Sequence, residues 1–98
     1  MYEAVALSVV LPAYNEEASL PEAFEQCRRL VDLLPGKIEV IVVDDGSEDS
    51  TPTVIEKACD ELPWLTLVRH DSNLGYGRAI RSGFAKAYTL SLHDALLI

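Results

Sequence analysis

Apolar and polar residues follow one another along the chain in three cycles, each a short apolar run and then a longer amphipathic segment. The apolar runs are residues 5–11, 38–43 and 65–69, and the first two are rich in β-branched side chains. Short, nearly continuous apolar runs are typical of strands buried on both faces of a parallel sheet. The pattern therefore predicts three parallel strands, the first of them stopped by Pro12.

The segments that follow the runs have the 3.6-residue apolar spacing of amphipathic helices. The first begins with a Ser19–Glu22 capping-box pair and ends at residues 35–36, and the second begins with Thr51 as N-cap before a proline. Strand and helix alternate three times, which predicts an α/β fold with β-α-β-α-β-α order and right-handed crossovers. The third helix should pack through Ala79, Ile80, Gly83, Phe84 and Ala87.

Two features predict that this sheet is incomplete. Strand 5–11 is as apolar as a central strand, and an exposed apolar edge is an aggregation hazard, so we expect it to have a neighbour on both sides. The chain also ends on "HDALLI", apolar to its last position. We therefore expect further strands beyond the three that the pattern predicts.

Composition narrows the classes of function. The chain has 98 residues, of which 49% are hydrophobic, which predicts one folded domain. Its formal net charge of −8 argues against a broad basic surface for nucleic acid. An anionic small ligand would have to be held by local dipoles, by one or two cations, or by a metal.

Other sequence features argue against an exported or membrane-spanning segment. Cys27 and Cys59 lie far apart on apolar helix positions, with neither metal nor disulfide spacing, and are interpreted as reduced core thiols of a cytosolic protein. The N-terminus lacks the basic region of a signal peptide. No apolar segment reaches the roughly 18 residues of a membrane span.

Three loops are expected to carry the chemistry, because ligands of open parallel sheets bind outside the carboxyl ends of the strands. The first is "PAYNEEAS". Pro12 fixes the exit from its strand, Tyr14 offers a flat face for a base, and Asn15 and Glu16 offer acceptors. The alternative is an ordinary strand-to-helix turn with a capping acid.

The second loop, "DDGSEDS", begins with two adjacent carboxylates. Asp44 and Asp45 should point to opposite sides of an extended chain, so we expect one to bind a ligand and the other to accept nearby backbone or hydroxyl donors. Gly46 permits a sharp turn with positive φ. The alternative, a solvated acidic turn before a helix N-terminus, explains Glu48 and Asp49 better than it explains Asp44.

The third loop, "HDSNLGYG", is rich in glycine but has neither the dinucleotide fingerprint nor the phosphate-loop spacing. Gly75 and Gly77 would let the backbone approach a ligand at a helix N-terminus. Arg78, in the first turn of that helix, could reach a diphosphate. The alternative is that the glycines serve tight packing and that Arg78 is a surface charge.

Taken in order, "SVVLPAYNEE", "IEVIVVDDGSEDST" and "NLGYGRAIRSGF" resemble the N-terminal part of family 2 glycosyltransferases of the GT-A fold, over residues 7–87. The resemblance is nearest to the branch that transfers sugars to polyprenyl phosphates. It implies a three-layer, Rossmann-like parallel sheet, here incomplete. It also implies that the chain binds a UDP- or GDP-type nucleotide-diphosphate sugar whose base donates a hydrogen bond to Asp45. The nucleotide-binding residues that it implies are Pro12, Ala13, Tyr14, Glu16, Asp44, Asp45, Gly46, Ser47, Asn73, Gly75, Gly77 and Arg78.

The chain departs from the family after residue 87. The family continues with a fourth strand, an Asp-x-Asp motif that holds Mg²⁺ or Mn²⁺ on the diphosphate, and a later catalytic base. None of these three features is expected in this chain, and Asp94 is given no metal role. Residues 1–87 are therefore expected to be a nucleotide-sugar-binding part with no catalytic residue, no metal ligand and no cofactor of its own. "SLHDALLI" looks like translated library-adapter sequence, so a non-native origin of residues 88–98 is a hypothesis that sequencing the source DNA would test.

The resemblance implies a role in cell envelope or glycolipid biosynthesis. The full-length enzyme would work in the cytoplasm, at the cytoplasmic face of the membrane, on a lipid-phosphate acceptor, and the fragment would be inactive alone. The alternative is a non-enzymatic, receiver-like α/β module with Asp71 as phosphoacceptor, which leaves "PAYNEE" and the Gly-x-Gly loop unexplained. His70 and His93 are interpreted as structural or surface residues without ligand partners.

Overall fold

The computed structural model describes residues 7–90 and 95–97. Its elements are β1 (Leu7–Ala13), α1 (Leu20–Leu33), β2 (Ile38–Asp45), α2 (Thr51–Glu61), β3 (Leu65–His70), α3 (Tyr76–Leu90) and β4 (Ala95–Leu97). The strands form one parallel sheet in the order β3-β2-β1-β4. The predicted α/β fold with β-α-β-α-β-α order is confirmed, and β4 adds a strand.

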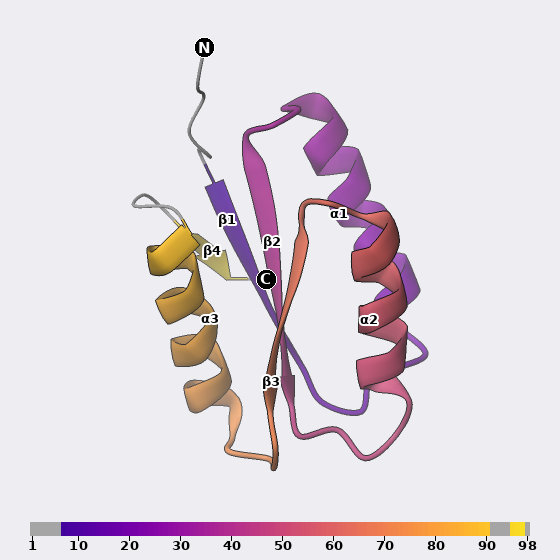
Figure 1. Cartoon of the computed structure of the whole chain (residues 1–98), viewed down its shortest axis with the longest axis vertical. Coiled ribbons are helices and arrows are strands. Elements are labelled where there is room, and N and C mark those ends of the chain that lie inside the picture. The colour runs from indigo at the N-terminus through magenta and orange to yellow at the C-terminus, as the bar shows by residue number, and fades with distance from the viewer. Residues whose placement is uncertain (1–6, 91–94, 98) are drawn as a thin grey trace.

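Helices cover both faces of the sheet, which gives three layers (Figure 1). Val9 and Val42 belong to the core under α1 and α2, whereas Val10 and Val43 belong to the core under α3. Adjacent residues of a strand point to opposite faces of a sheet. The apolar runs of β1 and β2 are continuous because each strand supplies side chains to both cores.

β1 has a neighbour on each side, as its apolar sequence predicted. It pairs with β2 along its whole length and with β4 at residues 8–10. β4 comes from the tail that departs from the family pattern. The non-native origin of that tail stays a hypothesis.

Pro12 does not stop β1, contrary to the prediction. The strand continues to Ala13, and Pro12 lies in register with Val43 of β2. Proline has no N–H to donate, so it is tolerated where a strand lacks a neighbour on one side. β4 reaches only as far as Val10, so β1 has no described neighbour at Pro12 on the side away from β2.

Ser19 is the N-cap of the first helix as predicted, but the hydrogen bonds at the starts of the first two helices differ from the prediction. Ser19 is the N-cap of α1, but its hydroxyl donates to Glu16 Oε2 at 2.8 Å, so the capping box with Glu22 does not form. The N-cap of α2 is Ser50, and Thr51 is its buried first residue, whose Oγ1 accepts the Glu16 N–H at 2.9 Å. Both hydroxyls therefore hold the loop after β1 instead of capping a helix.

α3 approaches the sheet closely through small residues. Ala79, Gly83 and Ala87 are buried at i, i+4 and i+8, and a Cβ placed on Gly83 would lie 2.3 Å from Val10 Cγ1. Phe84 was predicted on the same face, but it is 40% exposed. It lies one residue, or about 100°, further round the helix than Gly83, which turns it away from the sheet.

The cysteines are unpaired, as predicted. Cys27 is buried in the core between α1 and the sheet, and Cys59 is half-buried on α2. Burial raises the pKa of both thiols, which favours their neutral form. Near Cys59 the negative charges of Asp60 and Glu56 raise the pKa further, which is the opposite of the electropositive surroundings of a reactive cysteine.

Replacing Gly83 by alanine should destabilise the chain, because the added methyl group would overlap Val10. Overpacking of this kind costs about 1–3 kcal/mol. The matched control is Gly77→Ala in the same helix, where a Cβ meets nothing within 4 Å and alanine is the better helix former. Urea unfolding followed by circular dichroism measures both free energies. Equal stabilities for the two variants would contradict the close approach.

Candidate functional site

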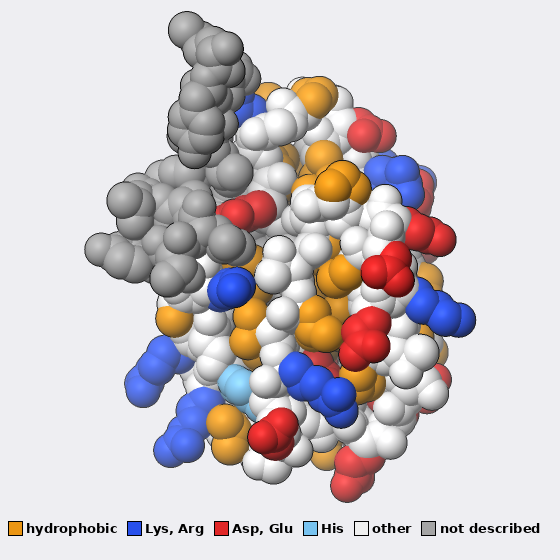
Figure 2. Space-filling view, viewed as in Figure 1, with side chains coloured by type: hydrophobic (Ala, Val, Ile, Leu, Met, Phe, Trp, Pro, Cys, Tyr) orange, Lys and Arg blue, Asp and Glu red, His pale blue; other side chains and the backbone are white. Residues whose placement is uncertain are grey.

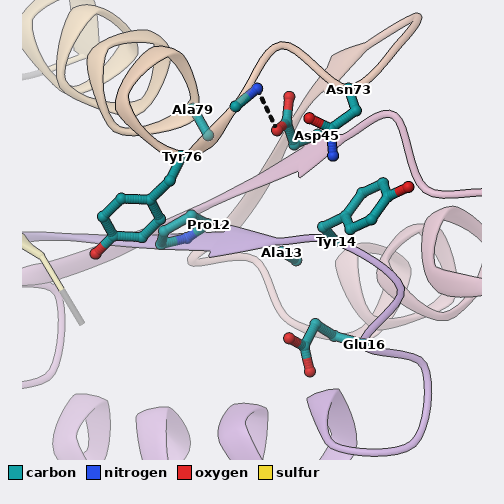
Figure 3. A pocket seen from close by; sticks show the side chains of 9 residues that line it. Pro12, Ala13, Tyr14, Glu16, Asp45, Asn73, Tyr76 and Ala79 are labelled. Carbon is teal, nitrogen blue, oxygen red and sulfur yellow. Dashed lines mark hydrogen bonds between the residues drawn. The ribbon is translucent and has the colours of Figure 1, made fainter.

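The predicted loops meet at the carboxyl ends of the strands, where the strand order reverses. β2 and β3 lie on one side of β1 and β4 lies on the other, so β1 borders the switch point of the sheet. A cavity of about 330 Å³ opens there, between the ends of β1 and β2 and the start of α3 (Figure 3). Open α/β sheets bind ligands at this position.

The cavity brings together seven of the residues predicted to bind a nucleotide, namely Pro12, Ala13, Tyr14, Glu16, Asp45, Asn73 and Gly75. The other predicted residues lie nearby but do not line it, namely Asp44, Gly46, Ser47, Gly77 and Arg78. Tyr76 and Ala79 line the cavity and were not predicted. The signal for Tyr76 was an aromatic residue between two glycines at a helix start, whereas Ala79 had been assigned only to the packed face of the helix.

Asp45 connects the end of β2 to the loop between β3 and α3. Its Oδ1 accepts the Leu74 N–H and its Oδ2 the Gly75 N–H, each at 2.9 Å. His70 Nδ1 lies 2.8 Å from the same Oδ1. The loop therefore folds back over the carboxylate, which is only 4% exposed but still lines the cavity.

The hydrogen bonds keep Asp45 ionised although it is buried. Burial raises the pKa of this carboxyl group, but the hydrogen bonds from His70, Leu74 and Gly75 lower it by more, so the pKa lies below its ordinary value. Hydrogen bonds to a carboxylate favour its charged form. Asp45 therefore presents a negative acceptor to the cavity at neutral pH.

Asp44 points to the opposite face, as the alternation of an extended strand predicted. It is fully buried, and its Oδ1 accepts the Ser47 N–H at 3.2 Å. Its Oδ2 has no hydrogen-bond partner among the described residues and lies 3.6 Å from Arg69 Nε. Asp44 therefore supports the turn after β2 and, although it was listed among the nucleotide-binding residues, it does not line the cavity.

Gly46 is required at the next position for two reasons. Its φ of +73° lies in the left-handed region, which glycine adopts without strain. A Cβ at this residue would also lie 2.3 Å from the carbonyl carbon of Ser72. The turn after β2 and the loop after β3 are therefore in backbone contact.

Asn15 ties the first loop to the second. It has a φ of +53°, its N–H donates to Ser47 Oγ at 2.9 Å, and its Oδ1 accepts the Glu48 N–H at 2.9 Å. The side chain that offered acceptors to a ligand is thus used to join loops. Figure 3 shows the rings of Tyr14 and Tyr76 at opposite ends of the cavity, where their exposed faces are free to stack on a planar group.

His70 is not isolated, contrary to the prediction. Its Nδ1 contacts Asp45, and its Nε2 lies 2.7 Å from Ser82 Oγ on α3. The interpretation failed because both partners are distant in sequence. His93 and Asp94 lie outside the described residues.

The described residues do not fit a divalent metal ion. Within residues 7–90 and 95–97, no group of three or more His, Cys, Asp or Glu side chains is placed to hold one.

Arg78 stands exposed in the first turn of α3, as predicted. Over the α1 and α2 side, Figure 2 shows acidic and basic side chains interspersed. No helix in this part of the chain is long and apolar enough to cross a membrane.

The chain matches known proteins along most of its length. The family model described as "Glycosyl transferase family 2" matches residues 8–90. The undecaprenyl-phosphate 4-deoxy-4-formamido-L-arabinose transferase of Shewanella sediminis is 40% identical over 80 residues, covering 80% of this chain and 24% of that protein. The dolichyl-phosphate beta-glucosyltransferase of Mus musculus is 42% identical over 87 residues, covering 79% and 26%. The chain spans about a quarter of the length of these relatives.

Two solved structures share the fold. The mannosyltransferase PcManGT from Pyrobaculum calidifontis, in complex with GDP-Man and Mn²⁺, superposes with a TM-score of 0.77 at 29% identity, covering 87% of this chain and 25% of that one. S. aureus TarS 1-349 gives a TM-score of 0.79 at 26% identity, covering 96% and 27%. These matches confirm the Rossmann-like GT-A architecture.

Acid should destabilise the wild-type chain more than the Asp45→Asn variant. Because the folded pKa of Asp45 is depressed, its contribution to stability is complete above the unfolded pKa of about 3.9 and is lost as the pH falls through the folded value. Urea unfolding between pH 6 and pH 2 measures the stability difference between the two proteins. The difference should be constant at the upper end and shrink below about pH 4. A stability difference that persists unchanged at low pH would contradict the depressed pKa of Asp45.

Proposed function

We propose that this chain, which belongs to glycosyl transferase family 2, forms the nucleotide-binding part of an enzyme that transfers a sugar from a UDP- or GDP-type nucleotide-diphosphate sugar. The observation that carries the proposal is the cavity at the switch point of the sheet, where two tyrosines flank an ionised, nearly buried Asp45. The receiver-like alternative is not supported, since the family match covers residues 8–90 and the exposed Asp71 lies outside the cavity.

The base and ribose are proposed to occupy the cavity itself. The base stacks on the face of Tyr14, an interaction that tolerates any base because every base has a π-face. A base N–H donates to Asp45, while Glu16 accepts from a ribose hydroxyl. Asp45 and Glu16 both line the cavity, and Figure 3 shows them on opposite sides of the end of β1.

The diphosphate is proposed to lie at the start of α3, next to the cavity. A helix N-terminus favours negative charge and offers unpaired backbone N–H groups. Gly77 has no side chain, and the space where its Cβ would stand is open. Arg78 is exposed in the same turn and supplies a cation within a chain of formal net charge −8.

The acceptor and the metal are proposed for the full-length protein. The related enzymes named above act, by their names, on undecaprenyl phosphate and dolichyl phosphate, so a polyprenyl phosphate at the cytoplasmic face of a membrane is the proposed acceptor. The mannosyltransferase structure holds Mn²⁺. Because the described residues offer no metal site, Mg²⁺ or Mn²⁺ would be held elsewhere in the full-length enzyme, and we derive no step through it.

The full-length protein should bind UDP or GDP through Tyr14 and Asp45. Tyr14→Ala removes the stacking face and Asp45→Asn removes the charged acceptor, so each should weaken the Kd by about tenfold or more. Isothermal titration with UDP and GDP in the presence of Mg²⁺ or Mn²⁺ measures these constants. The control is Asp60→Asn, an exposed acid on α2, which should bind like wild type. The proposal fails if the wild-type protein binds neither nucleotide.

Arg78 should recognise the diphosphate and not the nucleoside. Arg78→Ala is expected to weaken UDP or GDP binding about tenfold, the size of a lost charge-assisted hydrogen bond, and to leave uridine or guanosine binding unchanged. Arg81→Ala, an exposed arginine one turn along α3, is the matched control. Equal losses for nucleotide and nucleoside would show that Arg78 does not contact the diphosphate.

A further inference from the structure

We infer that His70 is a positioning residue of the nucleotide site: held by Ser82, it occupies Oδ1 of Asp45 and leaves that carboxylate one open acceptor position for the base. The inference rests on the proposed function, since it concerns how the same cavity reads its nucleotide. Its evidence is the set of contacts made by Asp45 and His70.

The direction of each hydrogen bond around His70 follows from its partners. An ionised carboxylate only accepts, so the Nδ1 atom, 2.8 Å from Asp45 Oδ1, carries the proton. In a neutral imidazole the other nitrogen is then an acceptor, so Nε2 receives the Ser82 hydroxyl at 2.7 Å. Asp45 thereby selects the tautomer, and the Ser82 hydroxyl, which can donate or accept, holds the other ring nitrogen in place.

Counting acceptor positions shows what remains for a ligand. An ionised carboxylate has roughly four such positions. The bonds from His70 and Leu74 fill Oδ1, and the bond from Gly75 takes one position on Oδ2. The open position is therefore on Oδ2, and Asp45 lines the cavity.

One open position favours a base with one N–H donor. Uracil presents a single N–H between two carbonyl groups, which matches one acceptor on Oδ2. Guanine presents two adjacent N–H donors, which pair best with both oxygens of a carboxylate, as other forked donors do. Because His70 occupies Oδ1, the second donor of guanine would be left without a partner, which carries a free-energy cost.

Removing the histidine should free the Asp45 carboxylate to turn. A carboxylate can rotate about its last side-chain bond, because this torsion has only broad preferences. The ring of His70 bridges β2 and α3 and holds the Asp45 carboxylate in one orientation. Without it, Oδ1 would be partly free for a second donor, and the site would discriminate less between the two kinds of base.

The test is isothermal titration of the full-length protein with UDP and GDP at one pH and one Mg²⁺ concentration. Wild type should bind UDP more tightly. His70→Phe keeps the ring but has no donor, so its Kd for UDP should rise about tenfold while the preference for UDP narrows. Ser82→Ala should change both quantities in the same direction but less. His70→Asn, whose amide nitrogen can take the place of Nδ1, should restore most of the preference.

Asp71→Asn, at the exposed neighbour of His70, is the control and should match wild type in both constants. Thermal denaturation of each variant checks folding, and the milder Ser82→Ala variant tests the inference even if His70→Phe is unstable. An unchanged preference in His70→Phe and Ser82→Ala, including equal losses for UDP and GDP, would overturn the inference while leaving the proposed function intact. A wild-type protein that binds neither nucleotide would instead end the proposed function, and this inference with it.

Discussion

The end of β2 carries a charge that the fold must satisfy. Asp45 is nearly buried and ionised, and an unpaired charge in such a place is costly. Its donors are the backbone of Leu74 and Gly75 and the ring of His70, so the loop after β3 has to return over β2 before α3 begins. The interaction that stabilises the carboxylate therefore also sets one wall of the cavity.

The loop after β1, whose Tyr14 and Glu16 also line the cavity, is held by a second set of bonds between loops. Asn15 exchanges hydrogen bonds with Ser47 and Glu48, and Thr51 accepts from Glu16, so the loop after β1 is joined to the loop after β2. These hydrogen bonds join protein groups to one another. A site whose loops are already ordered has less conformational entropy to lose on binding, which is how preorganisation improves affinity.

The order of strands and helices was predictable because apolar periodicity is a local property of the sequence. The same holds for Gly46, whose turn follows directly from the end of a strand. The predicted Ser19–Glu22 capping box and the predicted N-cap role of Thr51 were wrong because a hydroxyl that can cap a helix can equally bind a loop brought near by the fold. His70 was missed because its partner Asp45 is 25 residues away, and only strand order places them side by side.

Two carboxylates stand side by side because the sheet has two faces. Alternation sends Asp44 toward the layer of α1 and α2, where it supports its own turn through Ser47, and sends Asp45 toward the layer of α3, where it holds the next loop. Like charges on adjacent residues are thus separated by the backbone and satisfied by different donors. The end of β2 thus organises two loops. Exchanging the roles of Asp44 and Asp45 would need a one-residue shift in the register of the whole strand, because such a shift moves every side chain to the other face.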